Sequence, residues 1–362
     1  MKNKVLILLF EDICVDARVQ RQYEVFDNFA DVFLVAFNNK NYLHNNELFF
    51  SMGKEGSLLK SYLKFLKKIK LFTGFDFLVC NNVQSIIPSL LIKLFSPKTK
   101  IIYDSHELII KDPETGLSKA SRKSLFLEKM IVKLSDGIIV PNEDRASLMK
   151  KYYSLSQTPC VIPNLLESKF SESCNNDKFD EFTYIYQGVL NDNRFLIEIV
   201  ESFRYVDKAK LIIVGFGKLS GYMSQICNAP DLKGKVEFIP GLSRDELYKV
   251  TKQCHVGIVS YDFSSLNNKY CASNKISEYV LLGLPVLATP QLTLKKDLYE
   301  FNVGESFNRV DLESANLKCI AQSFVNMKEN YDVYLDGVKN NKDNFMFLSE
   351  KYSDVIFNRY IN

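Results

Sequence analysis

The feature that most constrains the fold is an alternation of apolar segments with amphipathic segments, which runs along the chain twice. Near the start, Val5–Phe10 and Val32–Phe37 are continuous apolar runs of strand length, and the segment between them repeats apolar residues at helical spacing. This rhythm predicts repeated βαβ units and a mostly parallel sheet. In the first half we also expect strands at Phe77–Cys80, Ile101–Tyr103, Gly137–Val140 and Cys160–Ile162, with helices near Arg18–Phe29, Ser57–Phe72, Ile86–Phe95, Ser118–Leu134 and Arg145–Tyr153.

The alternation restarts after Leu165–Asp180, a polar stretch with no apolar period that has the composition of a linker. Strands are predicted at Tyr184–Gln187, Lys210–Val214 and Val256–Ser260. A chain of 362 residues is too long for one compact core. We therefore predict an α/β protein with domains at 1–165 and 166–343, followed by an amphipathic helix in 344–362 that begins at Asn344.

One stretch carries a binding pattern of its own. From Asn274 an apolar stripe at helical spacing runs to Gly283, and Pro285 then opens a short strand. Ser273 or Asn274 stands at the N-cap position, with Lys275 in the first turn. Free N–H groups beside an ammonium group suit a diphosphate, and Glu278 one turn later can accept hydrogen bonds from sugar hydroxyls. The same residues would also fit an ordinary capped helix with a solvated lysine and glutamate.

Composition excludes several classes of protein. No apolar run is long enough to span a membrane, and the run after Met1 is too short for a signal peptide. The eight cysteines are scattered without metal-ligand spacing, which fits a reducing cytosol, so we expect a cytoplasmic protein. The loop after Val5–Phe10 contains no glycine, which argues against a nicotinamide-dependent oxidoreductase. There is no esterase G-x-S-x-G motif and no nucleic-acid-binding module.

Charge is distributed unevenly between the halves. Residues 1–165 carry 23 basic against 17 acidic side chains, a net +6, whereas the remainder carries −3. Two predicted helices, at 57–72 and 118–133, are basic and amphipathic. Such helices can lie on an anionic membrane surface, although they could equally be surface helices that pack on the sheet.

Several segments in order resemble a known family. Residues 273–289 read SNKISEYVLLGLPVLAT, residues 103–108 read YDSHEL and residues 161–164 read VIPN. These resemble the corresponding segments of family-4 glycosyltransferases, which are retaining sugar transferases of the GT-B fold. The resemblance covers nearly the whole chain. It implies two Rossmann-like domains with a cleft between them and a C-terminal helix that packs back on the N-terminal domain. By this resemblance, the domain at 1–165 would bind the acceptor and the domain at 166–343 would bind the nucleotide sugar.

The resemblance also implies roles for particular residues. His106 would lie against the donor sugar. The family loop after Gly188 usually carries two cations; Val189 occupies the first place here and Arg194 the second, so Arg194 would join Lys275 at the diphosphate. The resulting candidates are His106, Arg194, Lys275 and Glu278 as catalytic residues, with Gly188, Gly215, Gly217, Pro240, Gly241, Leu242, Asn274, Ile276 and Tyr270 around the donor.

One position departs from the family pattern. The family commonly has a second glutamate eight positions before Glu278, in contact with the donor sugar, and this chain has Tyr270 there. Asn267, Asn268 or Asp262 would then have to supply the missing hydrogen bonds. This departure keeps open a catalytically silent partner subunit as an alternative.

The expected function is transfer of a sugar from a nucleotide-diphosphate sugar, with UDP favoured, to a glycan or lipid-linked saccharide in surface polysaccharide biosynthesis. Retention of configuration is implied by the resemblance. Two cations and a helix N-terminus can replace a divalent metal at the diphosphate, so we expect no metal and no other cofactor. The place of action would be the cytoplasm, at the inner face of the plasma membrane if the basic helices bind lipid. A nucleotide-sugar epimerase of the same fold is the other enzymatic alternative.

Overall fold

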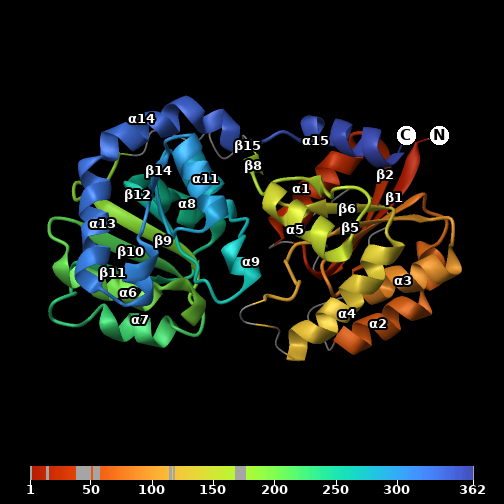
Figure 1. Cartoon of the computed structure of the whole chain (residues 1–362), viewed down its shortest axis with the longest axis horizontal. Helices are drawn as coiled ribbons and strands as arrows, with labels where there is room; N and C mark the ends of the chain where they lie inside the picture. Colours follow the sequence, from red (N-terminus) through yellow and green to blue (C-terminus); the bar gives the residue numbers. More distant parts are fainter. Residues whose placement is uncertain are drawn as a thin grey trace. The chain divides into compact units, whose positions relative to one another are not determined.

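The computed structural model describes residues 2–13, 16–37, 50–51, 58–113, 116, 119–167 and 177–361. The chain divides into two compact units (Figure 1). Unit 1 comprises Met1–Pro163 together with Leu348–Asn362, and unit 2 comprises Asn164–Phe347. Each unit is a parallel sheet with helices on both faces, so the predicted α/β class with two doubly wound domains is confirmed.

Unit 1 is built on a seven-stranded sheet in the order β3-β2-β1-β4-β5-β6-β7. The central strand β1 is buried from Val5 to Phe10 because helices cover both faces, which explains its continuous apolar run. The strand order changes direction between β1 and β4. The strands are β1 Asn3–Asp12, β2 Ala30–Phe37, β3 Phe50–Ser51, β4 Phe77–Asn81, β5 Lys100–Asp104, β6 Gly137–Val140 and β7 Cys160–Val161.

Two groups of helices cover this sheet. Figure 1 shows α2, α3 and α4 together on one side of unit 1, with α1 and α15 on the other. The prediction of one helix over 57–72 was wrong, because α2 ends at Lys67 and a separate 3₁₀ turn, Ile69–Phe72, follows Lys68. Ser57 and Ser118 lie outside the described residues. The helices are α1 Ala17–Asp27, α2 Leu58–Lys67, α3 Ile86–Phe95, α4 Lys119–Leu134, α5 Glu143–Tyr153 and α15 Ser349–Ile356.

Unit 2 is built on a six-stranded sheet in the order β11-β10-β9-β12-β13-β14. Its strands are also buried on both faces: in β9, Tyr184 and Tyr186 enter one apolar core and Ile185 enters the other. The strand order changes direction between β9 and β12. The strands are β9 Thr183–Val189, β10 Lys210–Phe216, β11 Val236–Pro240, β12 Val256–Val259, β13 Val286–Ala288 and β14 Gly304–Ser306.

The helices of unit 2 divide between the two cores. Residues of α6, α7 and α13 contribute to the first core, and residues of α10 and α11 contribute to the second. The predicted capping box that opens α8 is present, with Ser243 and Glu246 bonded reciprocally. The helices are α6 Leu196–Ser202, α7 Ser220–Ile226, α8 Arg244–Gln253, α9 Leu266–Lys269, α10 Asn274–Leu281, α11 Leu292–Glu300, α12 Arg309–Glu313, α13 Leu317–Glu329 and α14 Tyr331–Asn341.

The C-terminal helix begins later than predicted. Phe345 and Phe347 are buried in unit 2, and the short strand β15 Met346–Phe347 pairs with β8 Leu166–Glu167. The predicted helix start at Asn344 was therefore wrong, because Lys342–Phe345 form a 3₁₀ turn, Met346–Phe347 form strand β15, and α15 begins only at Ser349. Strand β8 lies within the predicted linker, of which residues 168–176 are outside the described part of the chain.

Helix α15 packs against α1 within unit 1. The Ser353 hydroxyl donates to the carbonyl of Val25 at 2.8 Å and accepts from the Asn28 amide at 2.7 Å. The rings of Phe29 and Phe357 meet edge-on at 5.6 Å. The last residues of the chain thus complete a fold that the first residues began.

A partly buried histidine should make the stability of unit 2 depend on pH. The Nδ1 atom of His255 accepts a hydrogen bond from the backbone N–H of Thr183 at 3.1 Å, so this ring must be neutral there. Burial, together with the charges of Lys178 and Lys328, lowers the pKa of His255 to about 4. Between pH ~6.5 and this value the unfolded chain binds a proton that the folded chain does not, so stability falls as the pH falls.

We expect His255→Gln to remove this part of the pH dependence, because an amide oxygen can accept the same bond without titrating. Thermal unfolding of both proteins from pH 7 to pH 4 would measure it, and the difference between the two curves cancels every other titrating group. Parallel curves would contradict the assignment.

Candidate functional site

The first candidate site lies in unit 2, at the carboxyl ends of β9 and β12. These neighbours in the sheet are where the strand order changes direction, and ligands of open α/β sheets bind outside the strand ends at such points. The N-terminus of helix α10 and the loops after β9 and β12 supply the polar groups. The structure therefore brings the segments around Gly188, Arg194 and Lys275 to one edge of the sheet.

Helix α10 presents its N-terminus with a single cap. Ser273 is the N-cap, and its hydroxyl accepts from the backbone N–H of Lys275 at 3.2 Å. The side-chain oxygen of Asn274 is buried and has no hydrogen-bond partner among the described residues. Ile276 is 2% exposed and its side chain packs in the core. The group that Ile276 itself can offer to a ligand is therefore its backbone N–H.

Tyr279 holds this helix against the sheet. A Cβ atom at Gly257 of β12 would lie 2.2 Å from the Tyr279 ring, so the ring occupies the space that a larger residue would need. The Tyr279 hydroxyl accepts from the N–H of Gln187 at 3.2 Å and faces the carbonyls of Ile185 and Ile258 at 3.3 and 3.4 Å. One side chain thereby fixes α10 to β9 and β12 together.

Two cations flank one aromatic ring at this site. The Lys275 ammonium lies 5.7 Å from the centre of the Tyr261 ring, and the Arg194 guanidinium lies 4.3 Å from it. Lys275 also lies 5.5 Å from the Tyr186 ring. The pair predicted to meet a diphosphate is therefore gathered around Tyr261.

Lys275 keeps its charge in this setting. Burial lowers the pKa of Lys275, but the Tyr261 and Tyr186 hydroxyls and the Glu278 carboxylate act in the opposite direction, and the net shift is upward despite Arg194. The ammonium group is consequently charged at neutral pH and available to an anion.

Gly188 is required where Lys275 crosses the end of β9. It has φ +135°, and a Cβ there would lie 2.8 Å from Cε and 2.9 Å from Nζ of Lys275. At the paired position on β10, a Cβ on Gly215 would lie 1.8 Å from the carbonyl oxygen of Gly188. Close packing of the two strand ends therefore accounts for Gly215, and a similar contact with Leu190 accounts for Gly217.

Glu278 is part of a series of hydrogen-bonded side chains that also includes Gln187 and Thr251. Its carboxylate accepts from the Gln187 amide at 2.6 Å, and the Gln187 oxygen accepts from the Thr251 hydroxyl at 2.9 Å. These bonds orient Glu278 on the first turns of α10. The carboxylate is partly exposed, so it can still accept from a ligand hydroxyl.

An exposed aromatic residue stands beside the glycine turns and was not predicted. Phe216 ends β10 and is 71% exposed, and its ring lies 3.2 Å from where a Cβ on Gly241 would stand. Pro240, which precedes Gly241, pairs with Gly215 across the sheet, and Leu242 follows. The available signal was an aromatic residue between two glycines directly after a predicted strand.

The loop that carries Tyr270 is held by its own polar groups. The Asp262 carboxylate accepts from the Asn268 amide at 2.5 Å and from the Ser264 hydroxyl at 2.8 Å. Two of the proposed substitutes for the missing glutamate, Asp262 and Asn268, are thus bonded to each other. Tyr270 itself closes helix α9, with its N–H bonded to the carbonyl of Leu266 at 2.9 Å.

The second candidate site lies in unit 1 and contains His106, which follows β5. Its Nε2 atom lies 3.0 Å from the side-chain oxygen of Asn81. The Asn81 amide nitrogen donates to Gln22, so its oxygen faces the ring and the histidine carries its proton on Nε2. Burial lowers the pKa of His106, although the nearby carboxylates of Asp104 and Asp16 oppose this shift, and the ring is neutral at pH 7.

A buried ion pair supports this histidine. Arg18 bonds Asp104 through Nη2 at 2.7 Å and through Nε at 3.1 Å, and its Nη1 donates to the carbonyl of Ile162 at 2.9 Å. Gln22 adds a bond to Asp104 at 2.8 Å. Both charges are satisfied in place, so they hold β5, α1 and the strand ends together.

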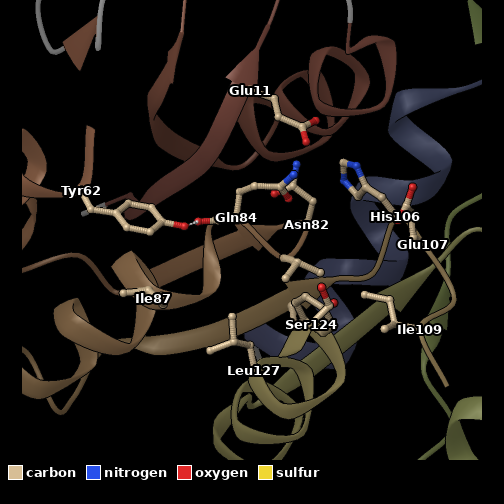
Figure 2. Close-up of a pocket in the computed structure, with 12 residues that line it drawn as sticks. Glu11, Tyr62, Asn82, Gln84, Ile87, His106, Glu107, Ile109, Ser124 and Leu127 are labelled. Carbon is tan, nitrogen blue, oxygen red and sulfur yellow. Dashed lines mark hydrogen bonds between the residues drawn. The ribbon is translucent and has the colours of Figure 1, made fainter. Parts of the chain in front are cut away.

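A cavity of about 700 Å³ opens beside His106. Figure 2 shows the side chains of Glu11 and Asn82 near the ring, with Ile87 and Leu127 across the hollow. Glu11 follows the apolar run of β1 and Asn82 follows β4, so both stand at the point where the sheet of unit 1 changes direction. Neither residue was predicted from the sequence, although Glu11 directly follows one predicted strand and Asn82 lies two residues after another.

Comparisons with known proteins identify the fold. No protein-family model matches the sequence, and no curated protein matches it significantly. Solved structures match it over nearly the whole length. Sucrose-phosphate synthase from Thermosynechococcus elongatus has a TM-score of 0.74 at 14% identity, covering 99% of this chain and 98% of the other.

Two further structures give the same result. Anabaena HepE in complex with UDP and glucose has a TM-score of 0.73 at 12% identity, covering 98% of each chain. WaaG, a glycosyltransferase involved in lipopolysaccharide biosynthesis, has a TM-score of 0.68 at 14% identity, covering 97% of this chain and 99% of the other. The class is thereby defined: this protein has the GT-B fold, as predicted.

The packing of the Tyr279 ring against Gly257 can be tested by substitution. Gly257→Ala would force a methyl group into the ring, and we expect a loss of about 1–3 kcal/mol in unfolding free energy, as is typical of overpacking. Urea unfolding would measure it. Gly221→Ala, in the first turn of α7, is the control, because nothing lies within 4 Å of its added Cβ and no packing loss is expected. Equal effects of both substitutions would contradict the packing argument.

Proposed function

We propose that this protein is a glycosyltransferase that takes its sugar from a nucleotide-diphosphate sugar, most readily a UDP-sugar. The observation that carries the proposal is the pair of cations, Lys275 and Arg194, gathered around Tyr261 at the N-terminus of α10. Two fixed positive charges and the free N–H groups of a helix terminus suit a diphosphate. The structure of HepE with UDP and glucose supports the choice of donor.

Residues around this pair of cations would bind the remaining parts of the donor. Glu278, oriented by Gln187, would accept from ribose hydroxyls, and the exposed ring of Phe216 offers a face on which a base can stack. Cleavage of the bond from sugar to phosphate leaves negative charge on the departing diphosphate. Lys275 and Arg194 stabilise that charge more in the transition state than in the ground state, and we propose that no divalent metal is needed.

The acceptor and the stereochemistry complete the proposal. The family resemblance of the sequence supports transfer with retention of configuration. We propose a glycan or a lipid-linked saccharide as acceptor, in the assembly of a surface polysaccharide. His106, neutral and fixed by Asn81, would hold hydroxyl groups of the sugar and would not act as a nucleophile.

Nucleotide binding tests the donor site. With chelator present, UDP at about 100 times its dissociation constant should stabilise the protein by roughly 2.7 kcal/mol and raise the unfolding midpoint by about 2–4 °C. Lys275→Ala should abolish this shift and lower turnover on the order of 10²–10³-fold. GDP, ADP and CMP provide the comparison that identifies the base.

A second variant separates the base from the diphosphate. Phe216→Ala should weaken the binding of UDP but leave the binding of inorganic pyrophosphate unchanged, whereas Lys275→Ala should weaken the binding of both. No shift with any nucleotide would favour the catalytically silent alternative that Tyr270 raises. Loss of turnover in chelator, with recovery in magnesium, would overturn metal independence.

One observation favours a second enzymatic function, that of a nucleotide-sugar epimerase. Glu11 and Glu107 line the cavity beside His106, and an epimerase would need such carboxyl groups for proton transfer. The two functions differ in their products. Incubation with donor alone would yield an epimeric sugar nucleotide from an epimerase, whereas a transferase would need the acceptor.

A surface of unit 1 supports contact with an anionic membrane. Helix α2 packs inward through Phe65, which leaves Leu59, Leu63 and Leu66 exposed as a stripe beside Lys64 and Lys67. The predicted apolar face therefore does not all pack on the sheet. Neighbouring helices add Leu94, Phe95 and Phe126, and exposures reach 66% at Leu59 and 72% at Leu94.

We propose that this surface, over α2, α3 and α4, is the peripheral contact with lipid. Exposed leucine and phenylalanine side chains would enter the interface while the lysines meet anionic headgroups. None of the helices that the structure describes is long and apolar enough to cross a bilayer. The proposed contact therefore lies on the surface of the membrane.

Vesicle binding tests this surface. We expect sedimentation with phosphatidylcholine–phosphatidylglycerol vesicles, weakened by salt and by Lys64→Ser with Lys67→Ser, at about 1 kcal/mol per lysine. Leu59→Ser with Leu63→Ser should weaken it further. Lys249→Ser with Leu292→Ser, exposed residues of unit 2, is the matched control. Vesicle binding that is unchanged by both pairs of unit 1 substitutions, or no vesicle binding at all, would rule out the contact.

A further inference from the structure

The cavity of unit 1 has a chemical character that the net charge of its half of the chain does not reveal. Its polar edge comes from the ends of three adjacent strands: Glu11 from β1, Asn82 after β4, and His106 with Glu107 after β5. Its apolar wall comes from the surrounding helices. Figure 2 shows Glu11, Asn82 and His106 close together on one side of the hollow, facing Ile87 and Leu127.

Asn82 is the group in this cavity that most clearly lacks a partner. It is only 8% exposed, yet neither its side-chain nitrogen nor its oxygen makes a hydrogen bond among the described residues. Its amide approaches the Glu11 carboxyl in the manner of a hydrogen bond and so lowers the pKa of that carboxyl in part, but the approach does not meet the geometry of a formed hydrogen bond. Asn82 also has φ +52°, which a residue with a side chain rarely adopts. A buried amide left without bonds is costly, so a ligand with hydroxyl groups would supply what it lacks.

The electrostatics of the cavity are acidic. Of the described residues that line it, Glu11 and Glu107 carry carboxyl groups and none is a lysine or arginine. Burial raises the pKa of Glu11, and the negative charges of Asp16 and Glu107 raise it further. The nearby guanidinium of Arg18 is taken up by Asp104 and the carbonyl of Ile162.

These features select between kinds of acceptor. A phosphate or a carboxylate in the cavity would face Glu11 and Glu107, and no cation among the described lining residues would offset the repulsion. An uncharged sugar ring presents hydroxyls to carboxylate and amide groups on one face and C–H groups to apolar side chains on the other. A pocket with a few placed polar groups and an otherwise apolar lining suits such a ligand.

We propose that this cavity binds the sugar ring of the acceptor in uncharged form, with Glu11 and Asn82 bonded to its hydroxyls and Ile87 and Leu127 packed on its C–H face. The proposal rests on the glycosyltransferase function proposed above and restricts its acceptor. Any phosphate of a lipid-linked acceptor would then lie outside the cavity. Glu11 and Asn82 are specificity-determining residues in this view.

The test compares matched pairs of sugars on the full chain in the presence of UDP. The probes are the methyl glycosides of glucose, galactose and mannose, each set against the corresponding 6-phosphate, with binding followed by saturation-transfer NMR and titration. We expect at least one methyl glycoside to bind, and its 6-phosphate to bind about tenfold more weakly or worse. A 6-phosphate that binds as tightly as its neutral counterpart would overturn the proposal, and so would a failure of all three glycosides to bind.

Variants assign the effect to the cavity. Glu11→Gln and Asn82→Ala should each weaken the neutral sugar about tenfold, which corresponds to 1.4 kcal/mol. Glu107→Lys, at an exposed position where folding is not at risk, should reduce the difference in binding affinity between the neutral sugar and its 6-phosphate. Asp31→Asn, an exposed carboxylate at β2, is the control and should change nothing. Unchanged binding in Glu11→Gln and Asn82→Ala, or an unchanged difference in affinity in Glu107→Lys, would count against the proposal.

The failure of this inference is distinguishable from failure of the donor assignment. UDP binding that depends on Lys275 reports on unit 2, whereas sugar binding that depends on Glu11 reports on unit 1. If UDP binds and no neutral sugar does, the acceptor inference alone is wrong. If a neutral sugar binds and UDP does not, the cavity assignment holds while the donor assignment is wrong.

Discussion

The candidate donor site depends on one phenol. The ring of Tyr279 lies over Gly257, and its hydroxyl meets the backbone of β9 and β12 at Gln187 and Ile258. Those two strands are where the sheet of unit 2 changes direction, so the contact that holds helix α10 also aims its N-terminus at the edge where ligands bind. Lys275, one turn before Tyr279, reaches across Gly188 as a consequence.

The two units use the same architecture for opposite electrostatics. In unit 2 the switch point gathers a lysine and an arginine around an aromatic ring, which suits an anion. In unit 1 it gathers Glu11 and a neutral His106, which suits hydroxyl groups. The net charges of the two halves have the reverse signs, because many lysines of the first half stand on outer helices and not in the cavity. Net charge describes the surface of a domain, whereas chemistry is decided by the few groups at strand ends.

Buried polar groups at the two candidate sites differ in whether the protein itself supplies their hydrogen-bond partners. Arg18 and Asp104 neutralise each other and accept or donate further bonds, so the pair stiffens the base of the His106 site. Asn82 and the side-chain oxygen of Asn274 lack such partners among the described residues, and each lies at a switch point. This contrast separates the groups that hold the fold from those that a substrate would complete.

The sequence by itself determined the class of fold and the chain's main chemical segments. Strands buried on both faces must be continuously apolar, so Val5–Phe10 and Lys210–Val214 could be recognised, and helix α10 with its cap and lysine could be placed from local pattern alone. Only the tertiary structure decided that Phe345 and Phe347 delay the last helix, that Phe65 turns three leucines of α2 outward, and that Glu11 and Asn82 share one cavity. The reason is physical: periodicity reports which face of a segment is apolar, but contacts between residues more than seventy positions apart depend on how strands are ordered in the sheet, and no local pattern encodes that order.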